Sequence, residues 1–261
     1  MGLVIRRIAT MATDIAAAAE ALLKARRDRI WLEALPEGAR PATAAEAAAI
    51  QQRVAEARGP IGGWKVGAAN PQAEPGAGPL NTVDLILTPG SVPASRFNVV
   101  GIEAEIAYLL GRDLPPRDTP YSREEVLDAV QSVHPVIELV DTRFTRLGVT
   151  DPLSHTADQV NHGALVVGPA LADWRRIDPV NQPVRLSFND KVVVEHVGGN
   201  TAGDPIRLLQ WLADTGARAY GGLSEGMIVT TGSCTGLLMI EPGTRVKAEF
   251  PGLGAVEIAV D

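Results

Sequence analysis

Cysteine, aromatic residues and excess positive charge are all scarce in this chain of 261 residues. Its one cysteine cannot form a disulfide within the chain, and aromatic residues make up 4%. Lys and Arg number 24 against 31 Asp and Glu, and the formal net charge of -7 has the wrong sign for nucleic acid. Uncharged stretches such as 226–240 are short and interrupted by Gly, Ser and Thr. We expect no nucleic-acid or membrane partner and a cytoplasmic location.

Cap signals predict four helices. Residues 1–13 carry no such signal, and we expect a disordered extension there. Asp14 precedes an apolar stripe, Thr43 with Glu46 and Ser122 with Glu125 make capping boxes, and Asp204 stands before a proline. The predicted helices cover residues 14–31, 44–58, 123–133 and 205–215.

Alternation of apolar and polar residues predicts more strands than helices. The segments are 63–67, 102–110, 134–141, 164–168, 185–188, 191–197, 227–232, 245–250 and 255–260. The pattern indicates an α+β fold rather than regular βαβ units. Residues 68–97, rich in Pro, Gly and Ala, are predicted to form a loop with one strand at 83–88. We expect a helical N-terminal part at 14–90 and a β-rich, metal-binding catalytic domain at 91–261.

Three glutamates stand out on two of the predicted strands. Glu103 and Glu105 alternate with apolar residues and share one strand face, while Glu138 lies in an almost wholly apolar strand. A carboxylate in such a strand needs a proton, a partner or a metal ion. No His or Cys stands near them at ligand spacing, so the expected ion is Mg²⁺ or Mn²⁺, which prefer oxygen ligands.

Two further segments carry polar groups next to predicted strands. Lys65, flanked by glycines in GWKVG, is expected to project into a pocket as a general acid or base or as a carboxylate ligand. The segment TTGSCTG at 230–236 offers Ser233, Thr235 and backbone N–H groups to an anionic oxygen, or it is simply a tight turn. Cys234 is expected to be a small buried filler rather than a nucleophile.

Taken together, six segments resemble the 2-keto-4-pentenoate hydratase family, within the fumarylacetoacetate hydrolase superfamily. They are GWKVGAAN, IEAEIAYLLGRDLP, HPVIELVDTR, TADQVNHGALVVG, GDPIRLLQWLAD and IVTTGSCTGLLMIEPGTRVKAEFPGLGAVEI, in the family's order. The resemblance covers about residue 14 to the C-terminus. It is specific because the Glu-x-Glu strand, the third Glu, the Gly-aromatic-Lys strand and the final TGS-x-TG segment recur together.

The resemblance implies a mixed β-roll of the fumarylacetoacetate hydrolase C-terminal type with a small helical N-terminal part. It implies Mg²⁺ or Mn²⁺ held by Glu103, Glu105 and Glu138, a catalytic Lys65, and a homo-oligomer. The implied activity is that of a hydro-lyase of aromatic-compound catabolism. Such an enzyme adds water to a 2-hydroxy-2,4-dienoate and forms a 4-hydroxy-2-oxo acid. Four further positions are candidates for substrate binding: Asp158, Asn161, Ser233 and Thr235.

The sequence departs from the family pattern at three places. Family hydratases carry an Asp in a QPDFG-like segment, where this chain has EPGAGPL at 74–80. Asn161 stands where the family's ADNAS-like segment has a Ser, with His162 after it, and the family's LTS-like continuation is replaced by Ala-Ala-Asn at 68–70. The missing Asp puts the second acid or base in doubt, and the other changes indicate a different substrate shape.

Two alternatives to hydration remain open. The first is metal-dependent decarboxylation of a 2-oxo-3-enedioate of the 4-oxalocrotonate type, whose second carboxylate Arg143 or His162 could meet if they are not packing residues. The second is a non-catalytic protein that binds 2-oxoacids, which retention of Lys65 disfavours. Hydrolysis is disfavoured because residues 68–101 contain no His of the kind that superfamily hydrolases use to activate water.

Overall fold

The structure is a computed structural model that describes residues 13–148 and 150–261. The expected disordered extension at 1–13 lies outside the described residues, Thr13 excepted. The α-helices are α1 (Ile15–Asp28), α2 (Ala44–Arg58), α3 (Arg123–Ala129), α4 (Pro152–Ala157) and α5 (Pro205–Trp211). The strands are β1 (Ile61–Gly67), β2 (Gly76–Asn81), β3 (Leu85–Leu87), β4 (Gly90–Val92), β5 (Gly101–Leu110), β6 (Val130–Val140), β7 (His162–Val167), β8 (Pro183–Phe188), β9 (Lys191–Val197), β10 (Ile228–Thr230), β11 (Leu238–Met239), β12 (Thr244–Phe250) and β13 (Gly254–Val260).

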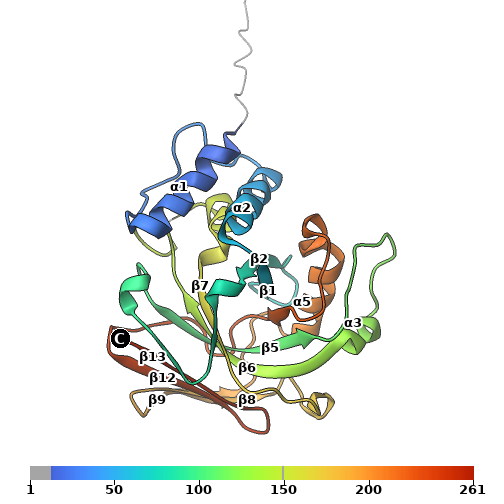
Figure 1. Cartoon of the computed structure of the whole chain (residues 1–261). Helices are drawn as coiled ribbons and strands as arrows, with labels where there is room; N and C mark the ends of the chain where they lie inside the picture. Colours follow the sequence, from blue (N-terminus) through green and yellow to red (C-terminus); the bar gives the residue numbers. More distant parts are fainter. Residues whose placement is uncertain (1–12, 149) are drawn as a thin grey trace, which may run out of the picture.

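The N-terminal helices begin where the sequence predicts. The Asp14 side chain accepts a hydrogen bond from the N–H of Ala17, and Thr43 and Glu46 form the predicted capping box. Leu22 of α1 and Ile50 of α2 are buried in one apolar cluster that also contains Phe144. The two helices therefore pack together above the sheets in Figure 1.

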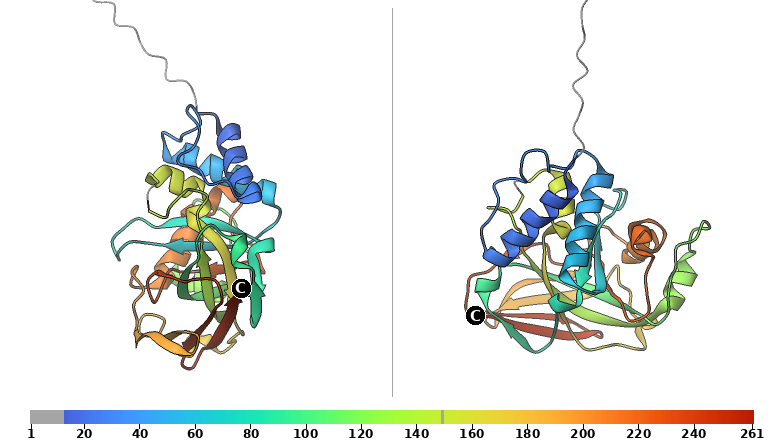
Figure 2. Two further views of the ribbon diagram at one scale, coloured as in Figure 1. Left: turned by 90° about the vertical axis from the view of Figure 1, so that its left-hand side faces the viewer. Right: turned by 45° about the horizontal axis from the view of Figure 1, so that its top comes forward.

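Two sheets form the rest of the molecule. The larger has eight strands in the order β2-β1-β10-β5-β6-β7-β3, with β11 paired to β5, and the smaller has the order β4-β13-β12-β8-β9. The main apolar core contains side chains of β5 and β6 from the larger sheet and of β8, β12 and β13 from the smaller one. Figure 2 shows the two sheets stacked, with the N-terminal helices beyond the larger sheet. The predicted α+β class with a mixed β-roll is confirmed.

Strands β5 and β6 are the long antiparallel pair at the centre of the larger sheet. Ile102, Ala104 and Ile106 of β5 belong to the core between the sheets. Because successive side chains of a strand point to opposite faces, Glu103 and Glu105 lie on the other face of the sheet, as predicted.

The prediction of a loop with one strand over residues 68–97 is wrong. β2, β3 and β4 all lie within it, and the 83–88 strand shortens to β3 after a 3-10 turn at Thr82–Asp84. β2 pairs with β1 through its backbone, so its sequence GAGPLN needs no alternation of side chains. The helix predicted over 123–133 ends at Ala129, because the chain from Val130 pairs with β5 instead.

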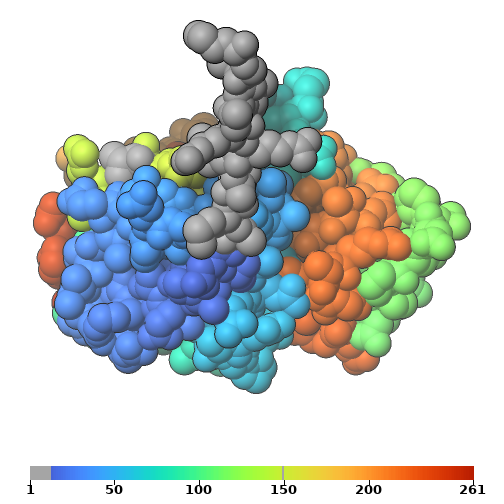
Figure 3. Space-filling model, turned by 90° about the horizontal axis from the view of Figure 1, so that it is seen from above, coloured from blue at the N-terminus to red at the C-terminus, as the bar shows by residue number. Residues whose placement is uncertain are grey.

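The larger sheet spans the expected domain boundary at 90–91. β1, β2 and β3 come from before it and β5, β6, β7 and β10 from after it. Figure 3 shows α1 and α2 in blue beside the orange segment around α5. There the Tyr220 hydroxyl donates to Gln51 of α2. None of the helices described has the length and apolar character needed to cross a membrane.

Candidate metal centre and active site

Three glutamates meet on the face of the larger sheet that is turned away from the main core. Glu103 of β5 lies directly opposite Glu138 of β6 in the strand register, and Glu105 follows on the same face. One carboxylate oxygen from each lies within 4.8 Å of the others. Glu105 is 2% exposed and Glu138 1%. The sequence prediction that these three residues converge is confirmed as geometry.

The segment after β10 holds one of the glutamates, Glu105. The Thr230 hydroxyl and the backbone N–H of Gly232, at 3.0 Å, donate to Oε2 of Glu105. Ser233 lines the same cavity as Glu103. The Thr235 hydroxyl oxygen accepts from the N–H of Ala104 at 3.1 Å, which ties the segment to β5. The anionic oxygens bound by the TTGSCTG segment thus include Oε2 of Glu105.

Lys65 enters the site from β1. Its Nζ donates to Oε1 of Glu138 at 2.6 Å and to the carbonyl oxygen of Val160 at 2.9 Å. Val160 has a positive φ of 53°, which is rare for a β-branched residue and costs on the order of 1–3 kcal/mol. This strained turn turns a backbone carbonyl toward the Lys65 ammonium.

The charges in the site do not balance. Burial and the neighbouring carboxylates raise the pKa of Glu103, and that of Glu105 further. Burial would raise the pKa of Glu138 too, but Lys65 and His162 hold it below its usual value. Burial would lower the pKa of Lys65, but Glu138 and Glu103 raise it, so the amine stays protonated at neutral pH. One ammonium therefore faces three carboxyl groups.

This donor set fits a hard divalent cation. Like charges directly opposite on a sheet repel, and the raised pKa values of Glu103 and Glu105 reflect their burial first and that repulsion second. Three converging carboxylate oxygens are ligands that Mg²⁺ and Mn²⁺ prefer. Among the described residues, Glu103, Glu105 and Glu138 are therefore the group that would hold a metal ion.

The site opens into a cavity of about 380 Å³. Lys65, Ser233 and the three glutamates line it, as the sequence predicts. The residues that complete its wall are Val66, Gly67, Ala68, Ala69, Glu74, Gly76, His155, Val160, Thr201, Gly232 and Gly236. A space of this size accommodates a small organic acid beside a metal ion.

Three predicted substrate ligands are not among the residues that line this cavity: Asp158, Asn161 and Thr235. Asp158 is 2% exposed, and its carboxylate accepts from Arg143 Nε at 2.5 Å and from the Arg143 backbone N–H at 3.0 Å. Arg143, an open candidate for a second substrate carboxylate, is thereby committed to buried aspartates. Cys234 is buried, and burial raises the pKa of its thiol to about 12, as expected for a filler.

The sequence reasoning missed His155 and Glu74 in the cavity wall. His155 lies on α4, and burial and the charge of Lys65 lower its pKa. Asp151-Pro152 is the same cap signal that predicts α5, so it could have predicted α4. Glu74 accepts a hydrogen bond from Trp211 Nε1 at 2.5 Å. Nothing in its Pro- and Gly-rich surroundings could have placed it there.

Known proteins resemble this chain over much of its length. The family model described as fumarylacetoacetate (FAA) hydrolase C-terminal matches residues 45–261. The chain is 30% identical over 165 residues to 2-keto-4-pentenoate hydratase 2 of Dechloromonas aromatica (strain RCB), covering 63% of this chain and 62% of that protein. It is 28% identical over 172 residues to a 4-oxalocrotonate decarboxylase of Pseudomonas sp, covering 65% and 64%. The chain thus spans less than two thirds of the length of the curated relatives it matches.

A solved structure shares the fold over nearly the whole chain. It is 4-oxalocrotonate decarboxylase from Pseudomonas putida G7, complexed with calcium and acetate. The TM-score is 0.82 at 24% identity, and the match covers 95% of this chain and 97% of that one. The same protein complexed with magnesium and adipate gives a TM-score of 0.81.

Proposed function

The chain belongs to the fumarylacetoacetate (FAA) hydrolase C-terminal family, and on this premise we propose that it is a metal-dependent hydratase. It adds water to a 2-hydroxy-2,4-dienoate of the 2-keto-4-pentenoate type and forms a 4-hydroxy-2-oxo acid in the breakdown of aromatic compounds. The observation that carries the proposal is the convergence of three glutamates, two of them buried, and one lysine on a cavity sized for a small acid. The name of the hydratase relative supports the substrate class.

The metal proposed for the site is Mg²⁺ or Mn²⁺, held by Glu103, Glu105 and Glu138. When bound, it supplies Lewis-acid polarisation of the substrate carboxylate and the adjoining C2 oxygen. The residues of the chain hold and orient the acid: Ser233 and Gly232 line the wall beside the glutamates, and Ala68 and Ala69 leave room for the carbon chain.

Lys65 is proposed to move the proton. It is protonated at neutral pH, so it donates a proton to the terminal carbon, C5, and recovers one from the C2 hydroxyl as that oxygen becomes the ketone. The resulting 2-oxo-3-enoate is electron-poor at C4. The oxygen of water then bonds to C4, and the proton that it releases is balanced by protonation of C3. The sum of these steps is the addition of one water molecule.

Decarboxylation of a 2-oxo-3-enedioate is the second candidate. The 4-oxalocrotonate decarboxylase relative supports it. Against it, the cavity wall adds Glu74 to the three glutamates, and its basic side chains among the described residues are Lys65 and His155. A second substrate carboxylate would meet more negative charge than positive, so we favour the monoacid substrate.

The test is turnover by metal-free protein supplied with Mg²⁺ or Mn²⁺ and fresh 2-hydroxypenta-2,4-dienoate, followed by ultraviolet absorbance and product mass. We expect metal-dependent gain of water that is lost in Lys65→Ala and Glu103→Ala and kept in Lys247→Ala, an exposed lysine on β12. Release of CO₂ from 2-oxohex-3-enedioate without hydration would move the assignment to decarboxylase. Metal-dependent oxalate binding without any turnover would indicate a non-catalytic binding protein.

The homo-oligomer expected from the family also remains a proposal. The edge strand β9 of the smaller sheet supports it, because it exposes Val192, Val193 and Val197 beside an unpaired strand edge. Light scattering on the purified protein should give a mass that is a multiple of 27.5 kDa. A mass of one chain would overturn this part of the proposal.

A further inference from the structure

His162 lies between two buried carboxylates at the start of β7. It is 0% exposed, with Nδ1 3.3 Å from Oε1 of Glu138 and Nε2 3.9 Å from Oδ2 of Asp84. Nε2 has no hydrogen-bond partner among the described residues. The proposed reaction does not use this histidine. The position of His162 behind Glu138 therefore needs its own explanation.

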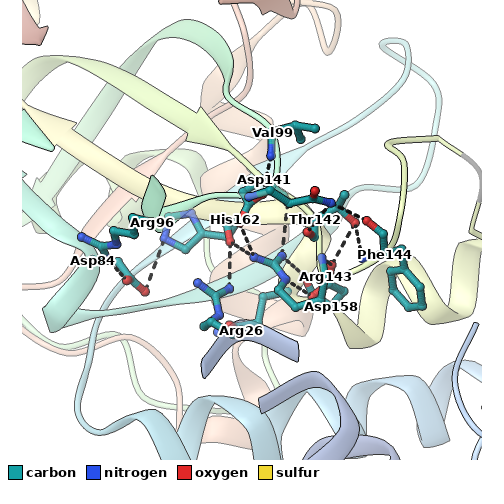
Figure 4. Close-up of polar contacts among 12 residues, drawn as sticks. Arg26, Asp84, Arg96, Val99, Asp141, Thr142, Arg143, Phe144, Asp158 and His162 are labelled. Carbon is teal, nitrogen blue, oxygen red and sulfur yellow. Dashed lines mark hydrogen bonds and ion pairs between the residues drawn. The ribbon is translucent and has the colours of Figure 1, made fainter. Parts of the chain in front are cut away.

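Arginines fix the histidine from behind. The carbonyl oxygen of His162 accepts from Arg26 Nη2 at 3.0 Å and from Arg143 Nη1 at 2.9 Å. Arg143 is itself 1% exposed and held by Asp158. Figure 4 shows His162 in this network, with both arginines on its carbonyl and Asp84 beyond its ring. The backbone at His162 is thus anchored to α1 and to the segment after β6, and the ring has little freedom to move.

The distances around the His162 ring indicate which of its nitrogens carries the donated proton. The carboxylate of Glu138, paired with Lys65, accepts hydrogen bonds, so a ring nitrogen within hydrogen-bond distance of it is the donor. The 3.9 Å from Nε2 to Asp84 is too long for a hydrogen bond, and Arg58 at 2.6 Å already neutralises that oxygen. The 3.3 Å from Nδ1 to Glu138 is within reach. The proton therefore belongs on Nδ1.

We propose that His162 is a positioning residue for the metal site: its Nδ1–H donates to Oε1 of Glu138 and, with Lys65, fixes that carboxylate toward Glu103 and Glu105. The inference rests on the metal site of the proposed function, but it does not depend on which reaction the site performs. Without the histidine, Lys65 would be the one remaining hydrogen-bond donor to the Glu138 carboxylate among the described residues. Groups that orient metal ligands in this way typically change metal affinity about 10- to 100-fold when removed.

Two substitutions separate the roles of the ring nitrogens. The side-chain amide nitrogen of asparagine falls near the position of Nδ1, whereas that of glutamine reaches the position of Nε2. We expect His162→Gln to weaken Mn²⁺ binding to the metal-free protein about 10- to 100-fold. His162→Asn should recover most of that loss. Mn²⁺ binding is measured by calorimetry or electron paramagnetic resonance, with no substrate present.

The matched control is His134→Gln, because His134 is another buried histidine whose ring bonds Ser132 and the carbonyl of Gly168. It should leave Mn²⁺ affinity unchanged. Equal affinity in His162→Gln and wild type, or equal losses in both His162 variants, would overturn the proposal.

A measurement on wild type covers the case in which the variants fail to fold. Nitrogen-15 chemical shifts of the ring should show the His162 proton on Nδ1 in the metal-free protein, and a proton on Nε2 would overturn the assignment. Failure of the proposed function looks different. Wild type that binds one Mn²⁺ without turning over any dienoate leaves the inference standing, whereas wild type that binds no Mn²⁺ overturns both.

Discussion

Two clusters of buried charged residues lie next to each other in this protein, and they differ in how their carboxylates are paired with positive charges. In the cluster behind the cavity, which we call the balanced cluster, every carboxylate has an arginine partner: Asp84 pairs with Arg58 and Arg96, and Asp141 and Asp158 pair with Arg143. Figure 4 shows the ion pairs and hydrogen bonds within this cluster. In the cavity cluster, which we call the unbalanced cluster, Lys65 is the one ammonium group among the described residues that faces Glu103, Glu105 and Glu138.

The difference separates a structural role from a functional one. A buried charge is stable only when it is paired or bound to a metal ion, so the balanced cluster needs no ligand and the unbalanced one does. The arginines of α1 and α2 reach the balanced cluster, which explains how the N-terminal helices support the site without lining the cavity. Predictions that remove one charge from each cluster test this comparison.

The largest effect is expected from the single cation of the unbalanced cluster. Lys65→Met should lower kcat by about 100- to 10,000-fold, the usual scale for losing a general acid or base. Metal binding should persist, because the three carboxylates remain. Steady-state rates with the dienoate measure the effect, and Lys247→Met serves as the control. A variant with wild-type kcat would show that Lys65 only balances charge.

The next effect is on folding and is expected in the balanced cluster. Arg143→Met leaves Asp141 and Asp158 buried without their partner, which should cost about 3–5 kcal/mol of unfolding free energy. Urea unfolding measures this cost. Arg175→Met, which removes an exposed ion pair with Asp128 of α3, should change the free energy of unfolding little. A small cost for Arg143→Met would mean that the aspartates find water or other partners.

A smaller change in the free energy of unfolding, a stabilisation, is expected from substituting Glu105 in the metal-free protein. Its folded-state pKa is raised, so the stability that the protonated form contributes is present in acid and is lost as the pH rises through that pKa. Glu105→Gln mimics the protonated form. It should therefore stabilise the metal-free protein at pH 8 by about 1–3 kcal/mol while weakening metal binding.

Urea unfolding with a chelator, at pH 5 and pH 8, checks this prediction. The gain from Glu105→Gln should shrink at pH 5, where the wild-type carboxyl is closer to its protonated form. Glu257→Gln, on the exposed side of β13, is the control. A variant that is less stable than wild type at pH 8 would contradict the view that this cluster is strained without a cation.

Cap signals and alternation predicted most of the fold because both are local. The capping boxes at Thr43 and Ser122 and the strand around Glu103 appear where the sequence placed them. β2 and β4 were missed because they form through backbone pairing with β1 and β13, and this pairing leaves no local pattern of apolar and polar residues in the sequence. In the same way, the pairing of Val130 with β5 ends α3 at Ala129.

The candidate site divides in the same way. The alternation of apolar and polar residues on β5 and the apolar surroundings of Glu138 indicated a shared carboxylate cluster. The flanking glycines indicated that Lys65 projects into a pocket. His155 and His162 needed the three-dimensional structure, because a turn of positive φ at Gln159–Asn161 brings them toward Lys65 and Glu138. Asp158 carries a family-like motif, yet its carboxylate is occupied by Arg143. A motif alone does not tell whether an acid faces the cavity or the balanced cluster.

Equilibrium binding of Mn²⁺ to the metal-free protein tests most directly whether the unbalanced cluster is a metal site. We predict one ion per chain, with affinity that rises with pH as Glu103 and Glu105 lose their protons, and with binding abolished in Glu103→Gln but unchanged in Glu257→Gln. No binding, or binding that Glu103→Gln leaves intact, would contradict the account.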